Sequence, residues 1–127
     1  MPHLTARVPE AQLAGRESAL ITALTDAVVQ VYGEWARGLV VVHLDGIPRG
    51  RWGIGGLVVD DASPAISFGI REAALTGPGG NEIAARLVVG LTEAVASILG
   101  EHARSGTSVE LLATPEGRAG LGGAISA

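Results

Sequence analysis

The sequence contains no cysteine, and aromatic residues make up only 3% of its 127 positions, although 47% of the residues are hydrophobic. The lack of cysteine excludes disulfides, thiolate zinc sites and cysteine nucleophiles. Because a ring buries more area than an aliphatic side chain, the core must be built from Leu, Val, Ile and Ala. The length suits one domain, and a core this light favours oligomerisation.

Basic residues are also scarce, with nine Lys and Arg against 13 Asp and Glu and a formal net charge of −4. No basic run is present, so we expect no nucleic-acid partner. Apolar runs such as residues 38–42 are too short to span a bilayer, and the first residues lack the pattern of a secretory signal. These features predict a soluble, cytoplasmic protein without a membrane partner. The absence of a His/Asp/Glu cluster at ligand spacing predicts no metal site.

The chain contains an internal repeat. Residues 48–56 match residues 115–123 at six of nine positions, and the offset is 115 − 48 = 67. The same offset, without gaps, aligns residues 24–28 with residues 91–95 and Gly33 with Gly100. One register across a helix, a turn and a glycine loop indicates a tandem duplication. In this register Gly69 takes the place of Pro2.

The first unit predicts a strand, a helix and a second strand. Residues 3–8 alternate between apolar and polar side chains, which is typical of a strand with one buried face. Apolar residues at helical spacing predict an amphipathic helix up to Tyr32, with Gly33 in a left-handed C-terminal cap. Residues 40–44 form a β-branched run that predicts a strand buried on both faces.

The second unit repeats this order, with strands at 65–70 and 109–113 and a helix that begins at the N-cap Asn81. A helical crossover between two strands indicates a parallel, right-handed pair. The sequence therefore predicts an α/β (α+β) domain over residues 1–127, with a four-stranded sheet and two helices on one face. The units are residues 1–59 and 64–127, with 60–63 as linker. We expect neighbouring subunits to cover the open face of the sheet.

Pro2 is the first candidate for chemistry. If Met1 is removed, Pro2 carries a free secondary amine, and burial in an apolar pocket disfavours its charged form. A neutral amine can take a proton from carbon beside a carbonyl and return it elsewhere. The alternative is that Pro2 only opens a strand, and composition alone favours that alternative.

The segment 50–56 has the glycine content of a phosphate-binding loop. It neither opens a helix nor contains the Lys-Ser/Thr pair of a P-loop, so a nucleotide site is not indicated. Glycines at these positions instead favour a tight hairpin with positive φ angles.

Together, the Met1-Pro2 start, the helix that ends at Gly33, the strand at 40–44 and the hairpin at 51–56 resemble a subunit of the 4-oxalocrotonate tautomerase type. The repeat extends this resemblance to the second unit. It implies a fused, tandem member of the tautomerase superfamily, with the tautomerase/MIF-like fold and a homotrimeric assembly of doubled chains. It also implies a cofactor-free site in which Pro2 is general base or acid, arginines hold the substrate's carboxylates and enol oxygen, and Trp52 forms an aromatic wall.

The chain departs from the family pattern at the arginines. The family's first arginine falls on Ala11-Gln12, and its second falls in the window that ends at His43. A dicarboxylate substrate is therefore not indicated. His43 is a candidate oxyanion or acid partner, with a core or interface histidine as the alternative. Arg71, next to the position that aligns with Pro2, is a candidate substrate-binding residue from the second unit, with a solvent-facing charge as the alternative.

These features predict a cofactor-free tautomerase (isomerase) that acts on a 2-oxo or enol acid, a small-molecule carbonyl or unsaturated acid. One alternative is a hydratase, dehalogenase or decarboxylase with a protonated Pro2, for which Glu10, Asp26 and Tyr32 are candidates to activate water. A second alternative, favoured by the missing arginines, is a catalytically silent scaffold or small-molecule binder.

Overall fold

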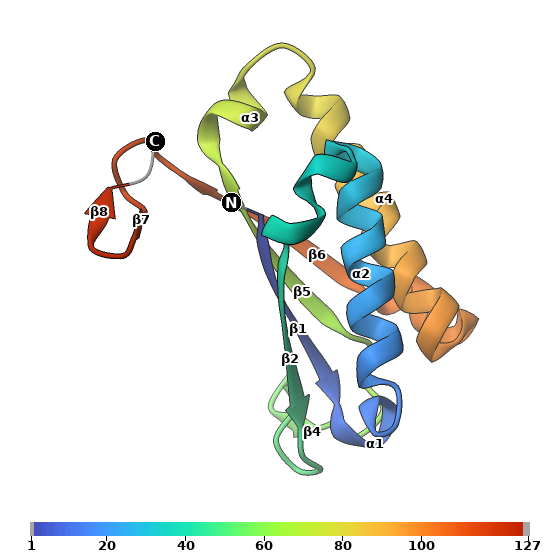
Figure 1. Cartoon of the computed structure of the whole chain (residues 1–127). Helices are drawn as coiled ribbons and strands as arrows, with labels where there is room; N and C mark the ends of the chain where they lie inside the picture. Colours follow the sequence, from blue (N-terminus) through green and yellow to red (C-terminus); the bar gives the residue numbers. More distant parts are fainter. Residues whose placement is uncertain (1, 126–127) are drawn as a thin grey trace.

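The computed structural model describes residues 2–125, and its elements repeat once along the chain (Figure 1). The first half contains β1 (His3–Pro9), α1 (Glu10–Leu13), α2 (Glu17–Tyr32), the 3-10 helix η1 (Glu34–Leu39), β2 (Val41–Ile47), β3 (Gly53–Ile54) and β4 (Leu57–Val58). The second half contains β5 (Ala65–Arg71), α3 (Glu72–Thr76), α4 (Gly80–Leu99), the 3-10 helix η2 (Glu101–Gly106), β6 (Ser108–Thr114), β7 (Gly120–Leu121) and β8 (Ala124–Ile125). The predicted tandem β-α-β plan is confirmed.

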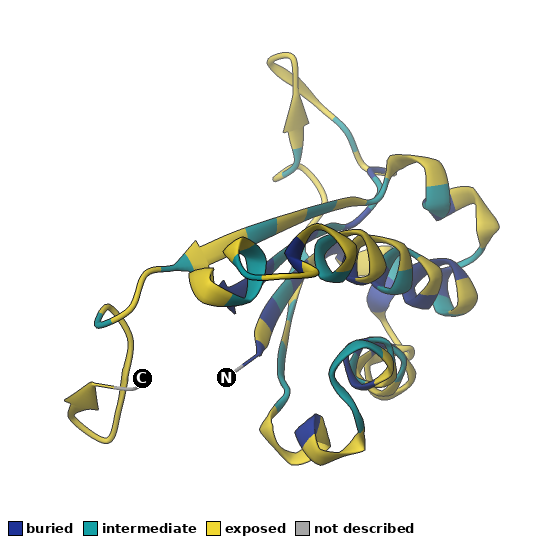
Figure 2. Cartoon of the chain, turned by 90° about the horizontal axis from the view of Figure 1, so that it is seen from above, coloured by how far each residue is buried: buried dark blue, intermediate teal, exposed yellow. Residues whose placement is uncertain are grey.

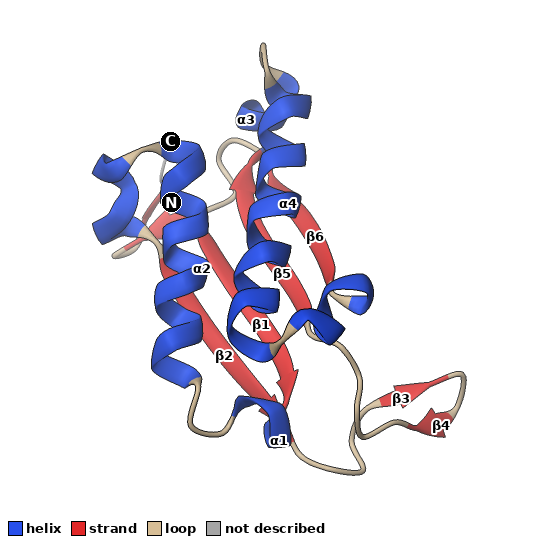
Figure 3. Ribbon diagram, turned by 90° about the vertical axis from the view of Figure 1, so that its right-hand side faces the viewer, coloured by secondary structure: helices blue, strands red, loops and turns tan. Residues whose placement is uncertain are grey.

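The main sheet has four strands in the order β2-β1-β5-β6. Strands β1 and β2 are parallel, as are β5 and β6, because a helical crossover joins each pair. The two units meet through β1 and β5, which are antiparallel. Helices α2 and α4 lie side by side over one face of the sheet (Figure 3), which confirms the predicted fold class. Because β1 and β5 are antiparallel, the start of β1 and the end of β5 lie at one end of the sheet. The end of β1 and the start of β5 lie at the other end.

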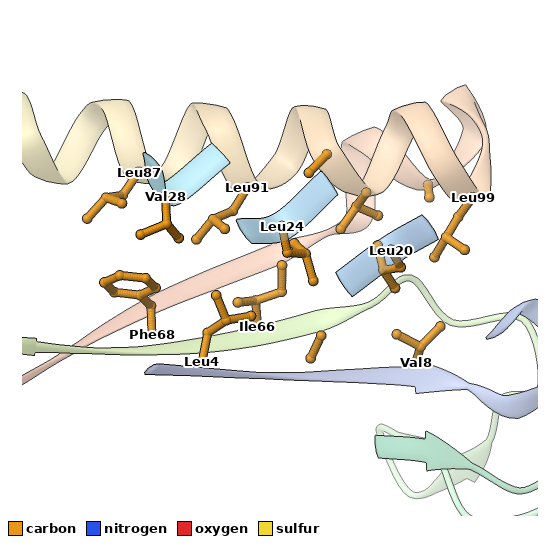
Figure 4. Packing of buried hydrophobic residues seen from close by; sticks show 14 of the residues in the cluster. Leu4, Val8, Leu20, Leu24, Val28, Ile66, Phe68, Leu87, Leu91 and Leu99 are labelled. Carbon is orange, nitrogen blue, oxygen red and sulfur yellow. The ribbon is translucent and has the colours of Figure 1, made fainter. Parts of the chain in front are cut away.

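The core lies between the sheet and the two long helices (Figure 4). Every second residue of β1 and β5 faces the helices and is buried, as the alternation in β1 predicts. The strands contribute Leu4, Ala6, Val8, Ile66, Phe68 and Ile70, and the helices contribute Leu20, Leu24, Val28, Leu87, Leu91 and Val95. Apart from Phe68, the single phenylalanine of the chain, this core is aliphatic, as the composition predicts.

The opposite face of the sheet is open in the single chain (Figure 2). Strand β2 is an edge strand, and His43 and Asp45 on it are exposed. The prediction that residues 40–44 form a strand buried on both faces was therefore wrong for the chain by itself. An apolar run does not reveal whether its second face is packed, because that depends on what lies beyond the sheet.

Two details of the helix ends also differ from the predictions. Gly33 and Gly100 both have positive φ, but their ψ angles of 162° and 155° place them outside the left-handed helical region. Essentially only glycine adopts such a conformation, which explains why both positions are glycines. The prediction of a left-handed cap at Gly33 was wrong. Helix α4 begins at Gly80 after Gly79, which is in the left-handed conformation, so Asn81 lies within the first turn and is not the N-cap.

The ungapped register of the repeat is wrong for the first strands. Strand β1 begins at His3 and β5 at Ala65, an offset of 65 − 3 = 62, whereas β2 and β6 differ by 108 − 41 = 67. The structural counterpart of Pro2 is therefore Pro64 rather than Gly69. The backbone carbonyls of both prolines accept an equivalent hydrogen bond of 3.1 Å, Pro2 from Val41 and Pro64 from Ser108. The five extra residues lie between β5 and the body of α4, where the second unit is longer.

Within residues 2–125, neither of the long helices combines the length and apolarity needed to cross a membrane.

Candidate active site

Pro2 is buried at the end of the sheet where β5 ends. Its carbonyl accepts a hydrogen bond from the backbone N–H of Val41, which ties it to the start of β2. The last antiparallel pair between β1 and β5 joins His3 to Gly69, so the register continued by one residue sets Pro2 beside Ile70. The amino end of the first unit thus lies against the carboxyl end of β5.

A cleft of about 470 Å³ opens at this end of the sheet, and we call it the Arg71 cleft. Its walls come from elements far apart in the sequence: His3 from β1, residues 69–71 and 73 from β5 and α3, and residues 114–116 and 119–121 from the end of β6 and the C-terminal hairpin. This volume lies in the range of small-molecule sites. Ile70, Ala119 and Leu121 make much of the lining apolar.

The charged side chains of the cleft are Arg71 and Glu116, with His3 as a third ionisable group. Tyr32, at the end of α2, lies within electrostatic reach of Arg71. Burial raises the pKa of the Tyr32 phenol, and the positive charge of Arg71 partly opposes this effect. Because the net pKa is raised above its usual value, Tyr32 stays protonated at neutral pH and is not suited to act as a base.

The structure brings Arg71 to the Pro2 end of the sheet, but not for the reason that the repeat suggested. In the register of the structure Arg71 corresponds to Pro9 (71 − 62 = 9), not to a neighbour of Pro2. It lies near Pro2 because β1 and β5 run antiparallel, which places the last residue of β5 beside the first residues of β1.

A second, much smaller pocket of about 10 Å³ lies at the opposite end of the sheet. Each residue of the first hairpin region corresponds to the residue 67 positions later in the second. Trp52, which lines the small pocket, therefore corresponds to Ala119, which lines the Arg71 cleft. Trp52 is half-buried against Pro9, at the end of β1 that is farthest from Pro2. The structure of one chain therefore does not bring Trp52 and Pro2 together.

His43 also lies outside the Arg71 cleft. It is exposed on β2, where it pairs with Thr5, and Thr5 in turn pairs with Ser67 across the antiparallel junction. The Thr5–Ser67 pair lies two residues along the strands from the His3–Gly69 pair, which lines the cleft. A single chain thus brings Pro2 and Arg71 to one end of the sheet, and leaves His43 and Trp52 elsewhere.

The other candidates for activating water are also distributed over the molecule. The carboxylate of Asp26 is 2.7 Å from the guanidinium of Arg37, and Glu10 lines the small pocket with Trp52. In the described part of the chain, no three His, Asp or Glu side chains are grouped as a metal site requires.

Sequence reasoning missed His3, Thr114 and Glu116 as lining residues of the cleft. The position of His3 directly after Pro2 was a signal, but its importance depends on what stands opposite it. That opposite residue is fixed by the antiparallel pairing of the two units, which no sequence pattern specifies.

No protein-family model matches the chain, and no curated protein matches it in sequence. Solved structures do. A fused 4-OT determined as an asymmetric trimer matches with a TM-score of 0.83 and 25% identity, over 97% of this chain and 94% of that one. A native fused 4-OT matches with a TM-score of 0.82 and 26% identity over the same shares. Over nearly its whole length the chain is similar to fused 4-OT proteins of the tautomerase superfamily, and its tandem plan matches theirs.

The likeness in fold extends to more distant structures. A macrophage migration inhibitory factor from Toxoplasma gondii matches with a TM-score of 0.74 over 98% of this chain and 99% of that one, at 14% identity. At that identity the likeness concerns the fold alone.

Proposed function

We propose that this chain is a cofactor-free tautomerase that uses the amine of Pro2 as general base and acid on a 2-oxo or enol acid. The observation that carries the proposal is that Pro2 is buried next to His3, a residue that lines the Arg71 cleft, in a chain with the fold of fused 4-OT proteins. The proposal requires removal of Met1, which lies outside the described residues, because an amide nitrogen cannot act as a base.

The chemistry is a proton relocation without a net change in composition. In ketonisation, the neutral Pro2 nitrogen takes the proton of the enol hydroxyl, and the resulting ammonium returns a proton to the adjacent carbon as the carbonyl forms. Burial favours the neutral amine in the resting enzyme. The guanidinium of Arg71 offsets the charge of the substrate carboxylate and of the developing enolate.

Assembly is part of the proposal. The β7–β8 hairpin (Figure 1) and the β3–β4 hairpin (Figure 3) project from the body of the chain. Both hairpins expose large apolar side chains. Among them, Leu57 is 74% exposed and Ile125 is 70% exposed. Since fused 4-OT relatives were solved as trimers, we propose that three copies of this chain form a homotrimer. Neighbouring copies would then cover the open face and supply Trp52 and His43 to the Pro2 site.

The test is the ketonisation of phenylenolpyruvate by the wild-type protein and by Pro2→Ala. We expect the substitution to lower kcat/KM at least about 100-fold, the scale of a lost general base. The matched control is Pro64→Ala, because Pro64 is the buried counterpart of Pro2 in the second unit but its nitrogen is an internal amide. This control should keep its activity.

Intact mass measurement of the purified protein should give the value for a chain without Met1. Retained Met1, or full activity in Pro2→Ala, would overturn the proposed mechanism. A well-folded wild-type protein that binds phenylpyruvate without turnover would instead favour the small-molecule binder. Hydration or decarboxylation of the same class of acids, with no ketonisation, would favour the protonated-proline alternative.

A further inference from the structure

We infer that His3 is a substrate-binding residue of the Arg71 cleft, and that Gly69 is a glycine in order to seat its imidazole ring. This inference rests on the proposed function, and it adds a second polar contact beside Arg71.

The imidazole of His3 occupies the space where a side chain at position 69 would otherwise be. His3 and Gly69 are directly paired across β1 and β5. A Cβ atom built on Gly69 would lie 2.1 Å from Cε1, 2.2 Å from Nε2 and 2.8 Å from Nδ1 of His3. The ring therefore lies across the backbone of Gly69, and both residues form part of the cleft wall.

The backbone of Gly69 gives no other reason for a glycine. Positive φ angles occur at ten other glycines of the described chain, but Gly69 has an ordinary strand conformation inside β5. A glycine within a strand weakens it and often marks a place where another group approaches closely. Here the approaching group is the imidazole, because any larger side chain at 69 would displace it from the cleft.

The opposite end of the sheet lacks a counterpart of the His3–Gly69 pair. The offset of 62 relates His3 to Ala65 and Gly69 to Arg7, and Arg7 pairs with Ala65 in the same antiparallel ladder. The histidine and the glycine are thus both absent from the equivalent place, where the pocket measures about 10 Å³ instead of about 470 Å³. The pair is a specialisation of the Pro2 end and not a repeated structural element.

The chemistry of the wall fits one end of a 2-oxo acid. Arg71 offers a charged, planar donor group to a carboxylate, and an imidazole nitrogen of His3 can donate a hydrogen bond to the neighbouring carbonyl or enol oxygen. The remaining lining is apolar apart from Thr114 and Glu116. A second carboxylate would meet the negative charge of Glu116. The site thus favours monocarboxylates with an apolar remainder.

The experiment compares His3→Ala, His3→Gln and Gly69→Ala in the full chain, with His102→Gln as the control. His102 is an exposed histidine whose ring also packs against a glycine, Gly100, but it lies on η2 outside the cleft. With phenylenolpyruvate as substrate, we expect His3→Ala and Gly69→Ala each to raise KM about ten-fold, the scale of one lost hydrogen bond to a charged ligand. His3→Gln, which keeps a donor, should recover part of the loss, and kcat should change much less than KM.

Binding is measured separately by calorimetry with phenylpyruvate in the Pro2→Ala background, where turnover is expected to be removed. His3→Ala should weaken this binding about ten-fold, and His102→Gln should leave it unchanged. Unchanged KM and unchanged binding in His3→Ala would overturn the inference about His3 and leave the role of Pro2 intact. Activity that survives Pro2→Ala would overturn the proposed function instead, and the calorimetric comparison would still decide the binding role of His3.

Discussion

Two glycines of α4 provide the sharpest test of the packing. Gly80 is the first residue of the helix, and a Cβ atom there would lie 2.0 Å from the backbone oxygen and 2.4 Å from the backbone carbon of Leu75. Gly90 is in the middle of the same helix, and a Cβ atom there would lie 3.6 Å from the Cβ of Ala27, an ordinary contact. The same substitution to alanine should therefore have opposite effects at the two positions.

The expected magnitudes follow from these distances. Gly80→Ala forces the new Cβ atom against the backbone of Leu75, a contact that side-chain rotation cannot relieve. Overpacking of this kind costs about 1–3 kcal/mol. Gly90→Ala removes an unfavourable glycine from a helix interior and should increase the free energy of unfolding by up to about 1 kcal/mol. The two variants should thus differ by about 1–4 kcal/mol.

Thermal and urea unfolding at one fixed protein concentration measure this difference, because the stability of a protein that forms oligomers, as proposed for this chain, depends on its concentration. A change of 1 kcal/mol moves Tm by about 2–8 °C across common domain sizes, so the two variants should separate clearly. If Gly80→Ala is as stable as the wild type, the close approach of α3 to the start of α4 is not as described. If Gly90→Ala is as destabilised as Gly80→Ala, the reasoning from the helix contact is refuted.

Two further predictions concern the core and the duplicated ion pairs. Phe68→Ala, at a fully buried position, should lower the free energy of unfolding by about 3–5 kcal/mol in urea titrations, and a loss below 1 kcal/mol would contradict its central place in the core. Hydrogen bonds from Arg104 lower the pKa of Glu101 and Glu93, so these carboxylates stabilise the fold above their unfolded pKa and lose that effect as pH falls through the folded pKa. The Tm difference between wild type and Arg104→Gln should therefore be largest above the ordinary pKa of a glutamate, about 4.3, and should shrink as the pH falls through the lowered folded-state pKa of the two carboxylates. A difference that stays constant with pH would show that packing and not charge is lost.

The duplicated ion pairs also show which features both units keep. Arg37 contacts Asp26 at 2.7 Å and Glu34 at 2.6 Å, and Arg104 contacts Glu93 and Glu101 in the equivalent way. In each unit this arginine joins the 3-10 helix to the preceding long helix. Such repeated contacts maintain the common fold, whereas residues that differ between the two ends, such as His3 and Gly69, are the ones that distinguish the candidate site.

Much of the fold follows from local sequence patterns. The alternation in residues 3–8 and the apolar spacing in residues 20–32 each describe one buried face, and burial of that face is what stabilises a strand or a helix. The two-residue turn at Gly55 and Gly56 also follows from sequence, because both have positive φ, which glycine adopts without strain. The resemblance of these segments to a known subunit then indicated the superfamily and pointed to Pro2.

The candidate site was decided by contacts that no local pattern contains. The antiparallel junction of β1 and β5 placed Arg71 and Gly69 at the Pro2 end, while the ungapped repeat had aligned Gly69 with Pro2 itself. The repeat was aligned on the helix ends and the hairpins, which share one offset. That alignment could not reveal the five extra residues that the second unit has before its long helix. The sequence by itself determined the elements, the duplication and the presence of Pro2, because these depend on neighbouring residues. Only the tertiary structure decided which residues surround that proline, because strand pairing joins positions more than sixty residues apart.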